Sequence, residues 1–182
     1  MSKFRITILC VDRIINKKKL LIFINPYGGK GKAKKIWASV ENLFKLSFFS
    51  YDIMYTTHYQ HAYEYTLTLP KDKYHGLISN SGDGIIHEIV NALMERKFKG
   101  EDIDIPVGII PAGSGNALAK TLSHEAGEVD CSPVVAAYLI LTGKTRKIDL
   151  LEIEFESKEK KTYAFLSINF AIIADIDLES ES

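Results

Sequence analysis

The 182-residue sequence has few of the residues that mark disulfide scaffolds, linkers or nucleic-acid clamps. Its 2 cysteines, Cys10 and Cys131, are isolated and lack metal-ligand spacing, which argues against a disulfide framework or a zinc site and favours a reducing compartment. Only 5 prolines are present, and there is no Pro/Ser-rich linker. The 23 Lys and Arg balance the 23 Asp and Glu, so the surplus positive charge of a general nucleic-acid binder is missing.

Long hydrophobic runs are also missing. The longest apolar tracts, Val134–Leu141 and Tyr163–Ile176, are too short or too interrupted for a membrane helix, and the N-terminus lacks the cleavage site of a signal peptide. Hydrophobic residues make up 46% of the chain and charged residues 25%, as in ordinary globular proteins. We therefore expect a soluble, cytoplasmic protein with one full domain, or one domain and a piece of a second.

Short apolar runs alternate with helical patterns along most of the chain. Each run has the length of a buried parallel strand and leads directly into small, turn-forming residues. Helical apolar spacing follows, for example at Ile85, Ile89 and Leu93. This alternation predicts an α/β fold, an open parallel sheet with helices on both faces. The predicted strands are Leu20–Ile24, Tyr51–Tyr55, Gly76–Asn80 and Pro106–Ile110, and further helices are expected around Ile36–Phe44 and Val134–Leu141.

The pattern changes after about residue 145. Leu150–Glu156 alternates in places, Ser157–Lys161 has the composition of a charged turn, and Thr162–Ile173 is a second strand-like run. These features predict a hairpin that begins a second, antiparallel region. We accordingly divide the chain into a domain at 18–145 and an incomplete one at 146–182.

The predicted strands end in loops that suit a nucleotide. Ligands of open α/β sheets bind at the carboxyl ends of strands, and glycines let backbone N–H groups approach phosphate oxygens. Two such loops are glycine-rich, at 28–32 and 113–116. The first is not a Walker A motif, because Ala33 follows Lys32, and the second does not complete GxGxxG, because Leu118 occupies the last glycine position.

Asp83 is the sharpest single candidate for catalysis. It follows a strand, opens a helix and is flanked by Gly82 and Gly84. Such a carboxylate can accept a proton from an attacking hydroxyl or hold a magnesium ion against phosphates. The structural alternative is an N-cap of its own helix, but a cap needs neither glycine, so the flanking pair favours function.

For other polar residues, the sequence leaves open whether they have a functional role or an ordinary structural one. Glu88 either faces the loop ends or is an exposed helical glutamate, and His58 and His61 either contact a nucleotide or lie on the surface. The acidic run Asp175–Glu181 is either a tail or a cation-binding cluster, and its composition favours the tail.

Three motifs together resemble the diacylglycerol kinase catalytic domain superfamily. They are Asn25-Pro26-Tyr27-Gly28-Gly29-Lys30-Gly31-Lys32, Ser81-Gly82-Asp83-Gly84-Ile85-Ile86-His87-Glu88, and Pro111-Ala112-Gly113-Ser114-Gly115-Asn116-Ala117. Within that superfamily the chain is most similar to the sphingosine kinases, through His87, Met94-Glu95-Arg96 and Ile173–Glu181. The resemblance runs from about Leu20 to the last residue.

The resemblance implies phosphorylation of the primary hydroxyl of sphingosine with ATP and Mg2+, and membrane contact only through that lipid. It makes Asp83 the general base and Asp177, with Asp175, the partner of the lipid amine. It also implies that 146–182 begins a β-sandwich domain that supplies most of the lipid pocket. The residues expected around the nucleotide are Asn25, Pro26, Tyr27, Thr56, Ser81, Gly82, Gly84, Glu88, Gly113, Ser114 and Gly115.

Alternatives within and outside this reading differ in testable ways. A diacylglycerol or ceramide kinase would share the glycine loops without needing Asp177, and a nucleotide-binding paralogue would bind ATP without transfer. An NAD kinase-like activity is disfavoured, because that related group usually has a glycine in place of Ser81. Tyr27 departs from the sphingosine kinases, which usually carry arginine there, so one phosphate or adenine contact differs.

Overall fold

The computed structural model describes residues 18–154 and 161–166. The chain divides into two compact units, residues 1–145 and 146–182. The first unit holds the central sheet and its helices, and the second holds a short hairpin.

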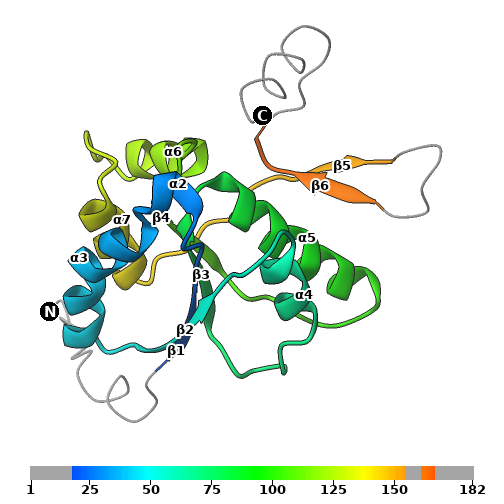
Figure 1. Cartoon of the computed structure of the whole chain (residues 1–182). Coiled ribbons are helices and arrows are strands. Elements are labelled where there is room, and N and C mark those ends of the chain that lie inside the picture. Colours follow the sequence, from blue (N-terminus) through cyan, green and yellow to red (C-terminus); the bar gives the residue numbers. More distant parts are fainter. Residues whose placement is uncertain (1–17, 155–160, 167–182) are drawn as a thin grey trace, which may run out of the picture. The chain divides into compact units, whose positions relative to one another are not determined.

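The sheet of the first unit has four parallel strands in the order β2-β1-β3-β4. Their ends fall within one residue of the predicted bounds, and the α/β class is confirmed (Figure 1). The order of the strands in the sheet could not be predicted from the sequence, because the composition of an apolar run does not indicate which strand it pairs with. The strands are β1 (Lys19–Ile24), β2 (Ser50–Tyr55), β3 (Gly76–Ser81) and β4 (Val107–Pro111).

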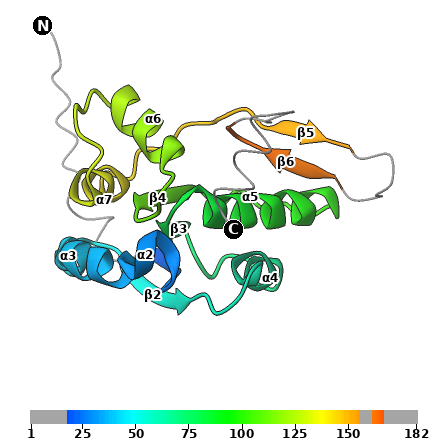
Figure 2. The same ribbon diagram turned by 45° about the horizontal axis from the view of Figure 1, so that its top comes forward.

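Helices connect the strands and cover both faces of the sheet (Figure 2). The predicted helical patterns form α3, α5 and α7, whereas α2, α4 and α6 were not predicted. α2 is a single turn within the segment expected to be the first glycine-rich loop, and the short sequences of α4 and α6 carry too few apolar residues at helical spacing. The helices are α2 (Gly28–Gly31), α3 (Ala33–Leu46), α4 (His61–Leu67), α5 (Asp83–Phe98), α6 (Ala117–Glu125) and α7 (Pro133–Leu141).

Two hydrophobic cores lie on opposite faces of the sheet. Successive strand residues point to opposite faces, so Ile22 packs into the core under α3 and α7, while Phe23 packs under α4 and α5. The first core contains an aromatic cluster in which the ring centroid of Trp37 lies 5.1 Å from that of Phe44 and 5.4 Å from that of Tyr51. Burial on both faces explains why β1 is almost continuously apolar.

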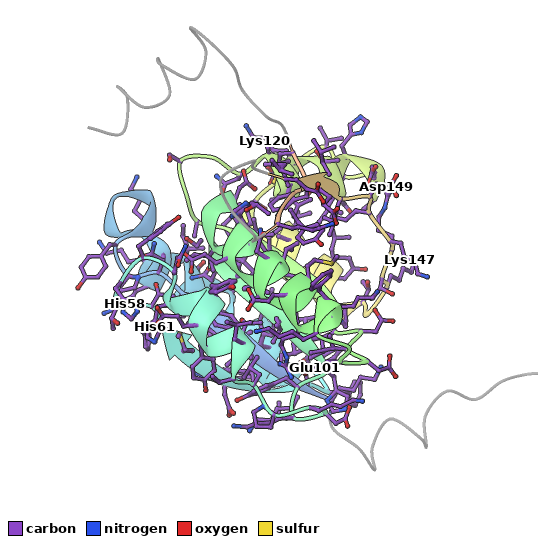
Figure 3. All side chains as sticks on the ribbon, turned by 90° about the vertical axis from the view of Figure 1, so that its right-hand side faces the viewer. His58, His61, Glu101, Lys120, Lys147 and Asp149 are labelled. Atoms are coloured by element: carbon purple, nitrogen blue, oxygen red, sulfur yellow. The ribbon has the colours of Figure 1, made fainter. Side chains whose placement is uncertain are left out.

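A buried arginine joins α4 to the C-terminal part of α5. Arg96 donates to the Thr66 carbonyl at 3.0 Å and to Glu101 Oε2 at 2.6 and 2.9 Å. Figure 3 shows Glu101 beside the C-terminal end of α5, away from His58 and His61 at the start of α4. The two helices are therefore held together at the end remote from the strand–helix loops.

The second unit contains an antiparallel pair of strands, β5 (Leu151–Ile153) and β6 (Thr162–Ala164). Lys161 Nζ lies 2.6 Å from Glu152 and 2.7 Å from Glu154, so the pair carries its own surface ion bridges. The predicted hairpin is present with shorter strands, and most of its predicted turn, along with residues after 166, lies outside the described residues. No helix in the described part combines the length and apolarity that a membrane span requires.

One surface network predicts a pH-dependent contribution to stability. Asp52 accepts from Lys19 Nζ and from Tyr74 Oη, each at 2.7 Å, and these bonds hold the pKa of the Asp52 carboxyl below its usual value. A lowered folded-state pKa stabilises the protein above the unfolded pKa of about 4, and that contribution disappears as the pH falls through the folded value. Asp52 is 40% exposed, so Asp52→Asn should cost under about 1 kcal/mol of unfolding free energy at pH 7.

The measurement is urea unfolding of wild type and Asp52→Asn between pH 7 and pH 3. The difference in unfolding free energy should shrink below about pH 4 as the wild-type carboxylate gains a proton. Asp72→Asn serves as the control, because Asp72 is exposed with φ 62°, a conformation that asparagine also tolerates. A difference that grows towards low pH would contradict the assignment.

Candidate functional site

The loops that follow the four strands begin at one edge of the sheet. The register pairs Ile24 with Tyr55, and Ser81 with Pro111, at the carboxyl ends of their strands. Since the strands are parallel, the segments that follow lie along the same edge. Ala112 N–H donates to the Ser81 carbonyl at 2.9 Å, which keeps the β3 and β4 loops together from their first residue.

The loops after β3 and β4 touch through their backbones. A Cβ placed on Gly113 would lie 2.4 Å from Gly82 Cα and 2.7 Å from Gly82 N. A Cβ on Gly82 would lie 2.9 Å from the Gly115 carbonyl oxygen. Only glycine permits this approach, which is closer than any side chain allows.

The Asp83 carboxylate caps a helix other than its own. Its Oδ2 accepts from Ala117 N–H at 2.8 Å and its Oδ1 from Leu118 N–H at 3.2 Å, both in the first turn of α6. The N-cap of α5 is Gly82, so the alternative that Asp83 caps its own helix is wrong. The first turns of α5 and α6 therefore converge on one carboxylate.

Asn116 shapes the loop between β4 and α6, although the sequence analysis assigned it no role. Its Oδ1 accepts from Gly113 N–H at 3.2 Å and its Nδ2 donates to the Gly113 carbonyl at 2.7 Å. An asparagine three residues after a glycine in a tight loop is a recognisable signal, because its amide can bond the backbone in both directions. The side chain thus fixes Gly113 where it meets Gly82.

The first glycine loop packs against β3. A Cβ on Gly28 would lie 3.1 Å from Ser81 Oγ and 3.4 Å from Asn25 Cγ, so these residues meet closely. Asn25 Oδ1 also accepts from Tyr27 N–H at 3.0 Å, and Gly31 has φ +76°, where a side chain would be strained. The Tyr27 side chain is 78% exposed.

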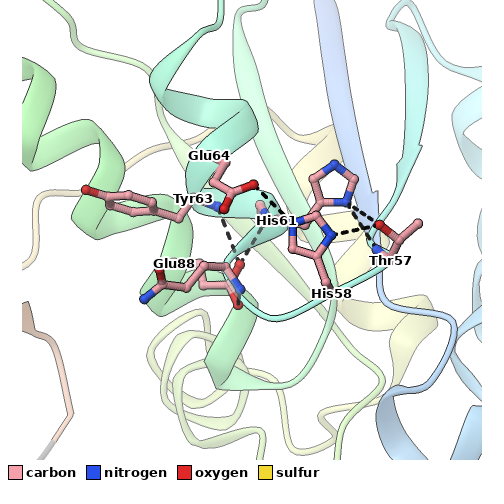
Figure 4. A network of polar contacts seen from close by, with 8 residues as sticks. Thr57, His58, His61, Tyr63, Glu64 and Glu88 are labelled. Atoms are coloured by element: carbon pink, nitrogen blue, oxygen red, sulfur yellow. Dashed lines mark hydrogen bonds and ion pairs between the residues drawn. The ribbon is translucent and has the colours of Figure 1, made fainter.

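Glu88 ties α5 to the start of α4 (Figure 4). Its carboxylate accepts from the backbone N–H groups of Gln60 at 3.1 Å, Ala62 at 3.0 Å and Tyr63 at 3.4 Å. The side chain is half-buried, so the alternative of an exposed helical glutamate is wrong. α5 consequently holds the N-termini of two neighbouring helices, α6 through Asp83 and α4 through Glu88.

The two histidines lie beside this contact. The rings of His58 and His61 stack with centroids 4.4 Å apart, and His58 Nε2 lies 3.0 Å from Glu64 Oε2. His61 Nδ1 accepts from Thr57 N–H at 3.1 Å. His58 is exposed and His61 half-buried, and both rings contact Thr57 in the loop that precedes α4.

The structure brings most of the predicted site residues to one edge. Asn25, Gly28 and Ser81 form one contact group, and Gly82, Asp83, Gly113 and Gly115 form a second that adjoins it. Thr56 is buried and donates its N–H to the Ile24 carbonyl at 2.9 Å. Pro26 is half-buried, and Ser114 is exposed on the β4 loop.

The contacts described above do not locate the predicted lipid-binding aspartates or a group of metal ligands. Asp175 and Asp177 lie outside the described residues. Within the part of the chain that the structure describes, no group of three or more His, Cys, Asp or Glu is placed to hold a metal ion.

Comparisons with known proteins identify the family that the three sequence motifs resemble. The family model of the diacylglycerol kinase catalytic domain matches residues 19–153. The chain is 39% identical to sphingosine kinase 1 of Arabidopsis thaliana, covering 90% of this chain and 33% of that protein. It is 38% identical to sphingoid long chain base kinase 4 of Schizosaccharomyces pombe, covering 93% of this chain and 36% of the relative. The chain thus spans about a third of the length of these relatives.

A solved structure supports the fold assignment. The crystal structure of a diacylglycerol kinase from Bacillus anthracis superposes with a TM-score of 0.59 at 26% identity. The match covers 74% of this chain and 42% of the other.

Proposed function

Since the chain belongs to the diacylglycerol kinase catalytic domain family, we propose that it is the nucleotide-binding part of a lipid kinase that transfers the terminal phosphoryl group of ATP to the primary hydroxyl of sphingosine. Residues 18–145 bind the nucleotide, and 146–182 begin the lipid-binding β-sandwich region. The observation that carries the proposal is the position of Asp83, which is held by the first turn of α6 at the point where the β3 and β4 loops touch.

The surroundings of Gly84 support phosphate binding. Apart from its chain neighbours and the backbone of its own helix, a Cβ on Gly84 would meet nothing within 4 Å, and its φ is not left-handed, so neither packing nor backbone geometry accounts for a glycine there. A residue without a side chain leaves space beside the N-terminus of α5 for an anionic group. The converging first turns of α5 and α6 supply N–H groups and partial positive charge to the same place.

The proposed chemistry needs one base and many positioning groups. The lipid hydroxyl oxygen forms a bond to the terminal phosphorus of ATP, the bond from that phosphorus to the bridging oxygen breaks, and ADP leaves with that oxygen. The hydroxyl proton passes to the Asp83 carboxylate, whose two N–H donors hold it in a defined orientation and leave further lone pairs free. Phosphoryl transfer depends chiefly on positioning and charge stabilisation, which suits a site built from backbone donors.

The remaining nucleotide contacts follow the resemblance. The proposed set is Asn25, Pro26, Tyr27, Thr56, Ser81, Gly82, Gly84, Glu88, Gly113, Ser114 and Gly115. Mg2+ fits this site as an ion carried mainly by the phosphates, because magnesium commonly binds through one or two carboxylates and substrate oxygens. Asp83 is the carboxylate of this site that would hold the ion, and the ion would neutralise charge on the phosphates.

Substrate choice is assigned to the acidic residues after the hairpin. Asp177, with Asp175, is proposed to pair with the amine of sphingosine, a group that diacylglycerol lacks. We propose that the protein works in the cytoplasm and contacts membranes through this lipid. A diacylglycerol or ceramide kinase is the competing assignment.

The Asp177→Asn variant separates these assignments. Loss of one charge-assisted contact of roughly 1.5–3 kcal/mol should lower kcat/KM for sphingosine by at least about tenfold. Phosphorylation of diacylglycerol, which has no amine, should not change. The measurement is transfer of labelled phosphate from ATP to each lipid in detergent micelles.

Three results would redirect the assignment. If the wild-type protein phosphorylates diacylglycerol or ceramide in preference to sphingosine, the preferred lipid would become the assigned substrate. Equal loss with both lipids would remove the amine-pairing role of Asp177. A folded chain that binds ATP and phosphorylates none of the lipids would favour a nucleotide-binding protein without catalysis.

A further inference from the structure

Asn80 is an unusual residue for the centre of this sheet. It lies on β3, where the register places it between Ile24 of β1 and Ile110 of β4, and its side chain is fully buried. It shares a sheet face with Ile78, which belongs to the hydrophobic core under α3. A buried amide in such a core costs free energy unless its polar atoms are bonded.

Only one end of the Asn80 amide has a partner. Nδ2 donates to the Ala33 carbonyl at 2.8 Å, while Oδ1 is buried without a hydrogen-bond partner among the described residues. Ala33 is the first residue of α3, so its carbonyl also receives the helical N–H bond four residues on. The bond from Asn80 therefore adds little stability to a carbonyl that the helix already satisfies.

The same bond has a clear geometric effect. The first glycine loop, residues 28–32, contains the short helix α2 (Gly28–Gly31), and α3 starts directly after it at Ala33. One end of that loop packs on Ser81 through Gly28, and the other end is bonded to Asn80 through Ala33. Two consecutive residues of β3, whose side chains point to opposite faces of the sheet, thus hold both ends of the loop.

We propose that Asn80 is a positioning residue that fixes the first glycine loop over the nucleotide site. It couples this loop to the Ser81–Gly84 turn, because Asn80 directly precedes that turn on the same strand. The local cost of an unpartnered buried oxygen is then offset by the placement of a loop that, within the described residues, no other side-chain hydrogen bond ties to β3. The nucleotide half of this inference rests on the proposed function.

The test is the Asn80→Leu variant of the full chain, which keeps the side-chain shape and removes both polar atoms. The urea midpoint should stay the same or rise, because an orphan oxygen disappears. Hydrogen exchange at the first turn of α3, including the Ile36 amide that bonds to Lys32, should become faster by about tenfold, the effect of one lost bond. The KM for ATP should rise by about tenfold while kcat stays within about twofold.

Ser79→Ala provides the matched control. Ser79 is the preceding residue of β3, is fully buried and also carries an unpartnered oxygen, but on the opposite face of the sheet. Its replacement should leave hydrogen exchange at the start of α3 and the KM for ATP unchanged. Both variants therefore remove a buried polar atom, and only one removes the tether.

The outcomes separate this inference from the proposed function. Unchanged exchange at the start of α3 in Asn80→Leu would overturn the tether, whatever the protein binds. Faster exchange with an unchanged KM for ATP would overturn its role in nucleotide placement. A wild-type chain that binds no ATP would overturn the proposed function and with it the nucleotide role, while the exchange result would still decide the tether. A lowered urea midpoint, with hydrogen exchange faster by the same factor at all backbone amides, would identify Asn80 as a stabilising residue only.

Discussion

Asp83→Asn should lower phosphoryl transfer by roughly 10²–10⁴-fold, the usual contribution of a general base. The variant keeps the size of the side chain but replaces the proton acceptor with an amide. Its single oxygen can serve one of the two α6 donors, Ala117 N–H or Leu118 N–H, and its NH2 group faces the other. Loss of half of the cap should also cost about 1 kcal/mol of unfolding free energy. The measurements are the rate of transfer from ATP and the urea unfolding curve.

A control of equal stability separates chemistry from folding. Ser132 caps α7, where its Oγ accepts from Val135 N–H at 3.3 Å, and it lies outside the proposed site. Ser132→Ala should lose a similar amount of stability, about 1 kcal/mol, with transfer unchanged. Transfer by Asp83→Asn at the level of the Ser132→Ala control would show that Asp83 is a structural cap alone.

Gly113→Ala should both destabilise the protein and lower the rate of transfer by about 100-fold. The new Cβ would lie 2.4 Å from Gly82 Cα and 2.7 Å from Gly82 N, and neither backbone atom can rotate away. The β3 and β4 loops must separate, at a cost of about 1–3 kcal/mol or more. A shift of about 1 Å at this junction is enough to lower the rate by about 100-fold. Urea unfolding and transfer from ATP measure the two effects.

Gly84→Ala is the informative comparison, because here the new Cβ meets nothing within 4 Å apart from its chain neighbours and the backbone of its own helix. Gly84 lies in the first turn of α5, so alanine should raise the unfolding free energy by about 0.5–1 kcal/mol. Transfer should nevertheless fall, since the methyl group enters the space proposed for the phosphates. A Gly84→Ala protein with full activity would show that this space is not used, and a stable Gly113→Ala protein would show that the two loops can move apart.

The fold class and the approximate location of the site followed from local patterns. Runs such as Leu20–Ile24 identify buried strands, because period and composition reflect burial within a few neighbouring residues. The helices with strong apolar spacing were predicted, whereas α4, which begins at His61, was not. Asp83 stood out through its glycine neighbours, and Gly82 indeed requires glycine for its contact with the β4 loop.

The roles of the polar side chains were decided by the tertiary structure. Asp83 and Glu88 were predicted from their neighbours in sequence, but they cap α6 and α4 across separations of 34 and 26 residues. Asn80 bonds to Ala33 across 47 residues, and no spacing rule relates two such positions.

A parallel α/β sheet with glycine-rich loops at its carboxyl edge can be predicted from the sequence, because strand burial, helical period and turn chemistry are local properties. Which carboxylate holds which helix, and which strand residue holds the first loop, cannot be predicted from local patterns. Those contacts depend on the strand order β2-β1-β3-β4, which brings distant segments side by side. A hydrogen bond requires its two atoms to meet within about 3 Å, and that distance is set by packing rather than by position along the chain.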